Sequence, residues 1–275
     1  MEFAQRWGGS NVMSTVLDSI IEGVLEDVHL RERPLSQMRE ELQSAPELRG
    51  ALQSLSRPGT QIISEVKRSS PSKGLLADIS SPGKLAEKYQ EGGAAVVSVL
   101  TEERRFKGSI ADFIEVRSAI EIPVLRKDFI VTEFQVLESR IMGADLLLLI
   151  VAGLSQSQYR DFHQMATELG MDVLVEVHNQ EELERALDIK PFIVGVNSRN
   201  LKTLELDFKV FDELLPLIPS GVLRVAESGI SERHEVAHIE ALGGKAILVG
   251  ETLVKAGNPQ EAISRLIGRE GTGSL

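Results

Sequence analysis

Apolar positions along most of this chain follow two patterns that alternate. From residue 62 onward, short and nearly continuous apolar runs are each followed by a longer segment whose apolar residues recur every three or four positions. The first pattern predicts buried parallel strands, and the second predicts amphipathic helices. We expect eight strands, at residues 62–67, 95–100, 123–127, 145–151, 172–177, 192–196, 222–226 and 246–249.

Helix-capping residues separate the predicted strands. Ser81-Pro82 and Asn258-Pro259 each combine an N-cap residue with a proline at the first helical position. Further N-cap candidates are Ser109, Thr132, Ser155, Asn179 and Ser231, and glycines where helices should end are Gly143, Gly170 and Gly243. The strand-then-helix unit is therefore expected to repeat along the whole chain.

Eight such units favour an α/β fold, the closed (β/α)8 or TIM barrel. An open doubly wound sheet is the alternative, but it usually has fewer strands and a glycine-rich first turn, which this chain lacks. Helical patterns at 14–33, 35–42 and 46–55 precede the first strand. We therefore expect one barrel at 14–275, with extra N-terminal helices at 14–60, and a leader or extension at 1–13.

Composition narrows the classes of function. Of the 275 residues 42% are hydrophobic, and the absence of cysteine excludes disulfides and thiol chemistry. A net charge of −11 argues against nucleic acid as a partner. No apolar run approaches the ~18 residues of a membrane span, and no signal peptide is apparent. We expect a cytoplasmic monomer that binds no membrane, with weak self-association as the alternative.

The first predicted strand carries two charges where a core strand is normally apolar. Glu65 and Lys67 are two residues apart, so they lie on the same side of the strand. Buried charges are costly unless they are paired. The two residues form either a structural ion pair on a solvated face or part of a site. The polar turn that follows, at the C-terminal end of a parallel strand, favours a site.

Most of the other predicted strands also end in polar residues. In a barrel these ends meet at one mouth, where catalytic groups lie. The strand-end residues include Lys127, Glu176, His178, Asn197, Arg199, Glu227, Ser228 and Glu251. Lysines and glutamates supply acids and bases, whereas the five histidines are scattered, so we expect no metal site. We expect His178 to support its neighbours rather than to react.

The last two predicted strands are followed by Ser228-Gly229 and by Gly250. Barrels often bind phosphate at this position, because glycine lets the backbone approach an anion. Glu251 is an unusual neighbour for phosphate. We expect its backbone N–H to donate while its carboxylate turns away.

Six segments of the chain resemble the sequence signatures of the indole-3-glycerol phosphate synthase family. They lie at 63–74, 125–129, 174–177, 195–201, 225–230 and 248–251, in the family's order and spacing. The stretch before Met13 lies outside this pattern, and Glu251 stands where some members have serine. The resemblance implies a TIM-barrel carboxy-lyase of tryptophan biosynthesis whose N-terminal helices are also a family feature.

The resemblance implies a phosphorylated small-molecule substrate, 1-(2-carboxyphenylamino)-1-deoxyribulose 5-phosphate. Ring closure with loss of CO2 and water would give indole-3-glycerol phosphate. Because decarboxylation restores the aromaticity of the ring without an external electron sink, no cofactor is expected.

The resemblance also implies roles for residues. Lys127 would donate to the substrate carbonyl oxygen, and Lys67 with Glu65 or Glu176 would serve the dehydration. The order in which the two lysines act stays open. Asn197 and Ser228 would orient the hydroxyl and carboxyl groups, Arg199 would face the anthranilate carboxylate, and Glu227 would orient its neighbours. The aryl ring would be bound by Leu100, Phe106, Phe129 and Leu204, and the phosphate by Lys67, Ser70, Gly229, Gly250 and Glu251.

Two other interpretations of the function are weaker than membership of the synthase family. Phosphoribosylanthranilate isomerase, a related phosphate-binding barrel, needs a cysteine base, and this chain has none. A barrel that binds a sugar phosphate without turnover would have no use for Lys127 and Glu176.

Overall fold

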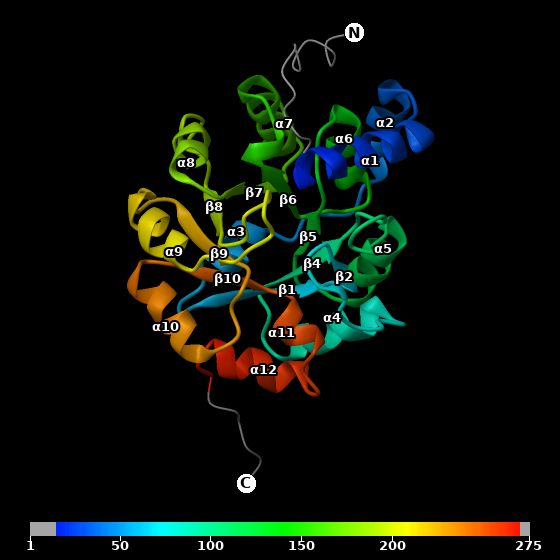
Figure 1. The fold of residues 1–275 in the computed structure, drawn as a ribbon. Coiled ribbons are helices and arrows are strands. Elements are labelled where there is room, and N and C mark those ends of the chain that lie inside the picture. The colour runs from blue at the N-terminus through cyan, green and yellow to red at the C-terminus, as the bar shows by residue number, and fades with distance from the viewer. Residues whose placement is uncertain (1–14, 270–275) are drawn as a thin grey trace.

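Eight parallel strands pair edge to edge and close on themselves in the computed structural model, which describes residues 15–269 (Figure 1). The strands are β1 (Gln61–Val66), β4 (Val96–Leu100), β5 (Val124–Lys127), β6 (Leu146–Ile150), β7 (Asp172–Val177), β8 (Ile193–Asn197), β9 (Leu223–Glu227) and β10 (Ala246–Val249). Because β1 pairs with both β10 and β4, the sheet has no free edge. The predicted (β/α)8 barrel is confirmed, and each predicted strand is correct to within one residue at either end.

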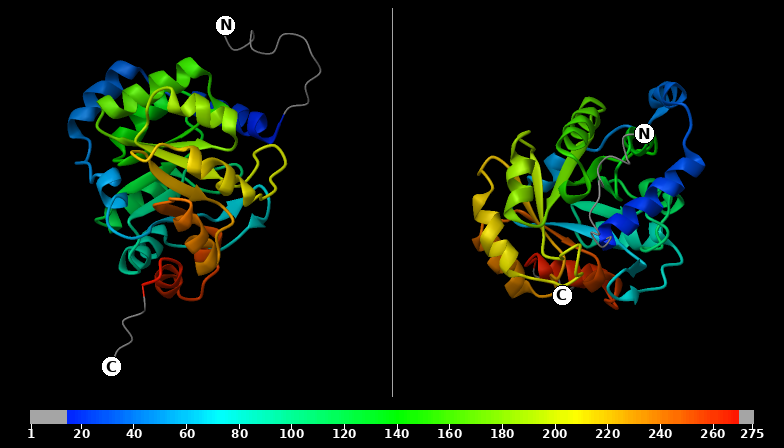
Figure 2. Two further views of the ribbon diagram at one scale, coloured as in Figure 1. Left: turned by 90° about the vertical axis from the view of Figure 1, so that its left-hand side faces the viewer. Right: turned by 45° about the horizontal axis from the view of Figure 1, so that its top comes forward.

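The helices form an outer layer around the strands (Figure 2). They are α4 (Pro82–Glu91), α5 (Ile110–Ala119), α6 (Glu133–Ile141), α7 (Gln156–Glu168), α8 (Gln180–Leu187), α9 (Lys209–Leu214), α10 (Arg233–Ala241), α11 (Glu251–Val254) and α12 (Pro259–Leu266). A short hairpin of β2 (Ser69–Ser70) and β3 (Gly74–Leu75) follows β1. No helix within residues 15–269 combines the length and the apolar character that a membrane crossing requires.

Successive side chains of each strand point alternately to the helices and to the inside of the barrel, which gives two apolar layers. In β1, Ile62 packs outward with the helices, whereas Ile63 belongs to the cluster inside the barrel. The same period of two brings Glu65 and Lys67 to the inner side. In β5 it brings Lys127 inward and Arg126 outward. The barrel interior is therefore apolar in its lower layers and charged at the C-terminal ends of the strands.

The capping predictions are confirmed at Ser81, Ser109, Thr132, Ser155, Asn179 and Asn258, whose side chains accept backbone N–H groups. The prediction for Ser231 is wrong, because the N-cap of α10 is Glu232. The carboxylate of Glu235 accepts the backbone N–H groups of Ser231 and Glu232. The predicted stops at Gly143, Gly170 and Gly243 are confirmed, each at positive φ just after a helix.

The lead-in contains α1 (Val16–Arg31), α2 (Leu35–Glu41) and α3 (Ala51–Leu55), with α1 and α2 beside α6 (Figure 1). The helix predicted at 46–55 is wrong for its first half. Residues 46–50 are not helical, because Gly50 has a φ of 61° and the N–H of Arg49 donates to Asp145 Oδ1 at 2.8 Å. The leader predicted at 1–13 lies outside the described residues.

Replacing Asp145 with alanine should destabilise the barrel and its lead-in together. The buried carboxylate accepts the N–H groups of Arg49 and Val124 at 2.8 Å each and lies 3.5 Å from Arg117 Nη2. Losing the partner of a buried guanidinium costs about 3 kcal/mol of unfolding free energy. Thermal unfolding followed by circular dichroism should show one transition at a lower midpoint, with Asp161→Ala on the exposed face of α7 as the unchanged control. Two separate transitions in the parent protein would contradict our expectation that the lead-in and the barrel form one unit.

Candidate active site

A cavity of about 370 Å³ opens at the C-terminal ends of the strands. Every residue predicted for the site lines it, in agreement with the expected convergence of the strand ends. These residues are Glu65, Lys67, Ser70, Leu100, Phe106, Lys127, Phe129, Glu176, Asn197, Arg199, Leu204, Glu227, Ser228, Gly229, Gly250 and Glu251. Their individual roles stay predictions.

Two lysines and three glutamates form the charged floor of the cavity. Lys127 Nζ lies 3.0 Å from Glu176 Oε2 and 3.7 Å from Glu227 Oε2. Lys67 Nζ lies 2.7 Å from Glu65 Oε1. The side chain of Lys127 is 14% exposed and that of Glu176 is 1% exposed. The β1 ion pair therefore belongs to the cavity rather than to a solvated face.

The three groups around Lys127 influence each other's protonation. Burial by itself would lower the pKa of Lys127, but Glu176 and then Glu227 outweigh it and raise the pKa above its ordinary value. Burial favours the neutral form of Glu176, yet the charge of Lys127 and contact with His178 lower its pKa. For Glu227, burial and the nearby charge of Glu176 both raise the pKa. At neutral pH Lys127 is therefore a stable ammonium and Glu176 a stable carboxylate, whereas Glu227 is readily protonated.

Two glycines make room for these carboxylates. A Cβ atom on Gly195 of β8 would overlap Glu227 Oε1, and one on Gly250 would overlap Glu65 Oε1. The structure therefore gives Gly250 a steric reason for being glycine, in addition to the predicted contact with phosphate. Gly195 was not predicted, because a glycine within an apolar run gives no sign of the carboxylate that packs against it.

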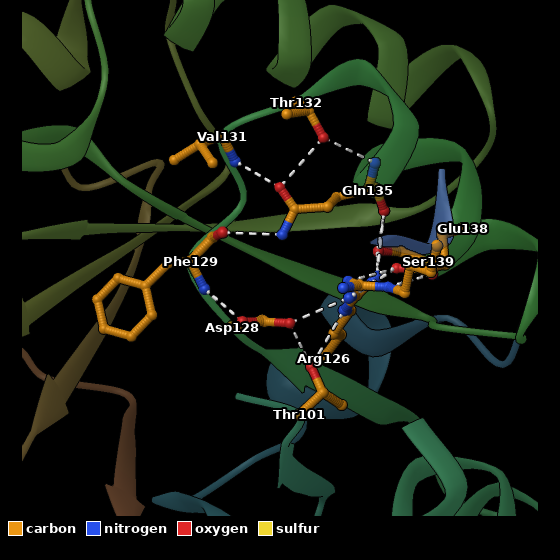
Figure 3. Close-up of polar contacts among 10 residues, drawn as sticks. Thr101, Arg126, Asp128, Phe129, Val131, Thr132, Gln135, Glu138 and Ser139 are labelled. Carbon is orange, nitrogen blue, oxygen red and sulfur yellow. Dashed lines mark hydrogen bonds and ion pairs between the residues drawn. The ribbon is translucent and has the colours of Figure 1, made fainter. Parts of the chain in front are cut away.

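Strand β5 is pinned from its outer side by a buried network (Figure 3). The fully buried Arg126 lies 3.0 Å from Asp128 Oδ2 and 2.9 Å from Glu138 Oε2. Asp128 Oδ1 accepts the N–H of Phe129 at 2.8 Å, and Gln135 donates to the carbonyl oxygen of Phe129 at 2.9 Å. The backbone on both sides of Lys127 and Phe129 is held by these contacts, so both side chains enter the cavity from a fixed support.

Two non-glycine residues at the rim have left-handed backbone conformations. Leu204 has a φ of 64° and Ser228 has a φ of 70°. The hydroxyl of Ser198 donates to the carbonyl oxygen of Ser228 at 3.0 Å, which helps to hold that conformation. Strained residues of this kind concentrate at functional sites, and both residues line the cavity.

Several lining residues were not predicted. Some of the apolar ones come from α1 and β6, namely Val16, Leu17, Ile20, Leu148 and Ile150. The helical pattern of α1 shows an apolar face but not what that face covers. Lys73 and Lys255 each donate to Glu251 Oε1 at 2.7 Å, so the Glu251 carboxylate is paired. No three His, Asp or Glu side chains are grouped to hold a metal ion within 15–269.

A closed (β/α)8 barrel with paired lysines and glutamates at its mouth defines the class of protein as a barrel enzyme. The family model for indole-3-glycerol phosphate synthase matches residues 17–266. The chain therefore belongs to the indole-3-glycerol phosphate synthase family, as its signatures suggested. This membership makes it a carboxy-lyase of tryptophan biosynthesis.

Similar proteins agree with this assignment. Indole-3-glycerol phosphate synthase of Mycolicibacterium smegmatis is 50% identical over 256 residues, which cover 92% of this chain and 94% of the relative. The enzyme of Paenarthrobacter aurescens is 50% identical over 257 residues, covering 91% and 94%. A structure of the tryptophan synthase complex from Pyrococcus furiosus is similar with a TM-score of 0.57 at 17% identity, covering 76% of this chain and 98% of that one. At such low identity this likeness shows the fold alone.

Replacing Gly195 with alanine should lower kcat without unfolding the barrel. The new methyl group would displace the Glu227 carboxylate, which lies beside Lys127, and a displacement of about 1 Å in an active site can reduce turnover on the order of 100-fold. Steady-state kinetics of the synthase reaction would measure the loss. Gly221→Ala is the matched control, because a Cβ there meets no atom within 4 Å. Equal kcat values for the two variants would show that Glu227 needs no precise position.

Proposed function

We propose that the cavity binds 1-(2-carboxyphenylamino)-1-deoxyribulose 5-phosphate and converts it to indole-3-glycerol phosphate, CO2 and water. The observation that carries this proposal is the arrangement of two lysine–glutamate pairs below an aromatic wall in one cavity. Such a cavity offers one end to an aryl ring and the other to a sugar phosphate. The reaction needs acids and bases but no electron acceptor, and these side chains supply them.

The aryl ring of the substrate binds between apolar side chains at the rim. Phe106 and Phe129 have ring centroids 6.1 Å apart and planes tilted by 41°, and Leu100 and Leu204 line the same cavity. Arg199 faces the carboxylate of the ring. Its guanidinium donates to Ser72 Oγ at 3.1 Å and to the carbonyl oxygen of Leu204 at 2.9 Å, so it is held between two loops. A guanidinium so occupied grips the departing carboxylate only moderately, which suits its loss as CO2.

The phosphate binds at the ends of β1, β9 and β10. Lys67 and Ser70 approach it from the first loop, and the backbone of Gly229, Gly250 and Glu251 approaches it from the last two. Lys73 and Lys255 neutralise the Glu251 carboxylate, which makes this rim tolerant of an anion. Positive φ at Gly229 is compatible with the close backbone approach that an anion requires.

Lys127 acts in ring closure. Its ammonium donates to the C2′ carbonyl oxygen while the electron-rich ring carbon attacks, so the new charge on oxygen develops next to a fixed cation. Glu176 keeps the ammonium in place from 3.0 Å. Loss of CO2 then breaks the bond between the ring carbon and the carboxyl carbon. The electron pair of that bond stays in the ring system and restores its aromaticity.

Lys67 and Glu65 act in the dehydration. Lys67 protonates the departing hydroxyl. Glu65, whose Oε1 lies 2.7 Å from Lys67 Nζ, takes up the proton that the ring system releases. Asn197 and Ser228 orient the substrate hydroxyl groups between the two lysines. Glu227 faces Lys127 and keeps it between two carboxyl groups.

We also propose that the enzyme acts as a cytoplasmic monomer. Residues of a single chain enclose the cavity, and the family is one of small-molecule biosynthesis. Sedimentation of the purified protein at micromolar concentration should give a mass near 30.2 kDa, the mass of one chain. A mass of twice that value would contradict the monomer.

The purified protein should convert the substrate to an indole product without added metal and in the presence of EDTA. Electrons are redistributed only within the substrate, and lysine and glutamate supply the protons. The rise of indole fluorescence measures turnover. Abolition of turnover by EDTA, with recovery on adding a metal ion, would overturn the metal-free mechanism.

Lys127→Ala should lose at least 100-fold in kcat with a modest change in KM, because the ammonium acts chiefly on the charge of the transition state. Lys84→Ala, on the exposed face of α4, removes the same charge away from the cavity and should leave both constants unchanged. A raised KM with normal kcat for Lys127→Ala would make Lys127 a binding residue instead.

A further inference from the structure

His178 lies directly behind the Lys127–Glu176 pair. Its ring Nε2 is 3.1 Å from Glu176 Oε1, the oxygen opposite the one that contacts Lys127. Its ring Nδ1 is 2.9 Å from Glu182 Oε2 on α8. The side chain is 8% exposed, so water competes little with either contact. Glu182, His178, Glu176 and Lys127 therefore form a row of groups with alternating charge that leads from α8 to the cavity.

The two contacts determine the protonation of the ring. A neutral imidazole has one N–H and one lone pair, so with a carboxylate at each nitrogen the lone pair would face one of them. The imidazolium carries an N–H on each nitrogen and a charge that matches both carboxylates. Nδ1 forms a hydrogen bond with Glu182, whereas Nε2 lies 3.1 Å from Glu176 Oε1 as an ion pair without hydrogen-bond geometry. Burial opposes this charge, but Glu176 and Glu182 outweigh it and raise the pKa of His178 to about 9.

Helix α8 holds the ring in place. Glu182 accepts the backbone N–H of His178 at 2.8 Å through the same oxygen that contacts the ring. Its other oxygen accepts from Asn179 Nδ2 at 2.7 Å, and Asn179 Oδ1 accepts the N–H of Glu182 at 3.0 Å. The cap of the helix thus doubles as the support of the imidazole ring.

We propose that His178, supported by Glu182, is a positioning residue for the catalytic pair. The imidazolium holds one oxygen of Glu176, so the other oxygen stays aimed at Lys127. The inference rests on the proposed role of Lys127 in ring closure. His178 is not among the residues that line the cavity, so we expect its substitution to affect turnover rather than substrate binding.

The arrangement predicts how activity changes at alkaline pH. The charged groups of this row are Glu176 from β7, His178 directly after β7, Glu182 from α8, Lys127 from β5 and Glu227 from β9. The pKa of His178 is raised in the folded protein, so the imidazolium is the main form of the ring at neutral pH and is lost as the pH rises through about 9. Glu176 then loses one partner, and kcat should fall.

The test compares two glutamine substitutions in the first turn of α8. Glu182→Gln removes the charge next to the ring and should move the alkaline limb of kcat to lower pH by about one unit, with KM unchanged. Glu181→Gln removes a charge from the same turn at an exposed position and should leave the limb in place. His178→Gln should lower kcat about tenfold and remove the limb, because an amide does not titrate.

Nitrogen NMR of the labelled imidazole separates this inference from the proposed function. The parent ring should titrate near pH 9, and the Glu182→Gln ring at lower pH. If the ring titrates as expected while kcat profiles of all variants match the parent, the positioning role is overturned and the synthase assignment stands. A ring that is neutral at pH 7 would equally overturn it. A parent protein without synthase activity would refute the proposed function, and the ring titration would still report on the geometry.

Discussion

The buried ion pair of Lys127 and Glu176 is the interaction on which the mouth of this barrel depends. An isolated charge at that depth would lose its hydration without compensation. Each of these two groups compensates the other, and His178 extends the alternation of charge on the far side of Glu176. A set of carboxylates this close would repel one another without the cations between them. The charge pattern and the stability of the mouth therefore rest on the same contacts.

A single strand separates two polar networks with different tasks. On the inner side of β5, Lys127 faces the cavity, and on the outer side Arg126 joins Asp128 and Glu138. Arg31 of α1 also contacts Glu138, at 3.0 Å. The outer network thus links α1, which lines the cavity, to the strand that carries Lys127. Close packing transmits position across the strand because the backbone between the networks has little freedom.

Local pattern predicted much of this molecule. Parallel strands buried on both faces are nearly continuous apolar runs, so their bounds could be predicted to within one residue. Helix starts were predictable because a capping side chain and its partner lie three residues apart. In the lead-in, prediction failed where a distant residue competes for the backbone. Asp145 takes the N–H of Arg49, and Asp172 takes the N–H of Leu52 from outside the lead-in, which limits the helix expected there.

The sequence by itself determined which side of each strand carries charge, because alternation along a strand is a local property. It also determined the family, since six signatures kept their order and spacing. Only the tertiary structure decided which charges meet. Closure of the barrel places Lys127 beside Glu176, puts Gly195 where Glu227 needs space, and lets α8 present Glu182 to His178. Distances between groups far apart in the chain are set by how the strands close and pack, and no local pattern contains them.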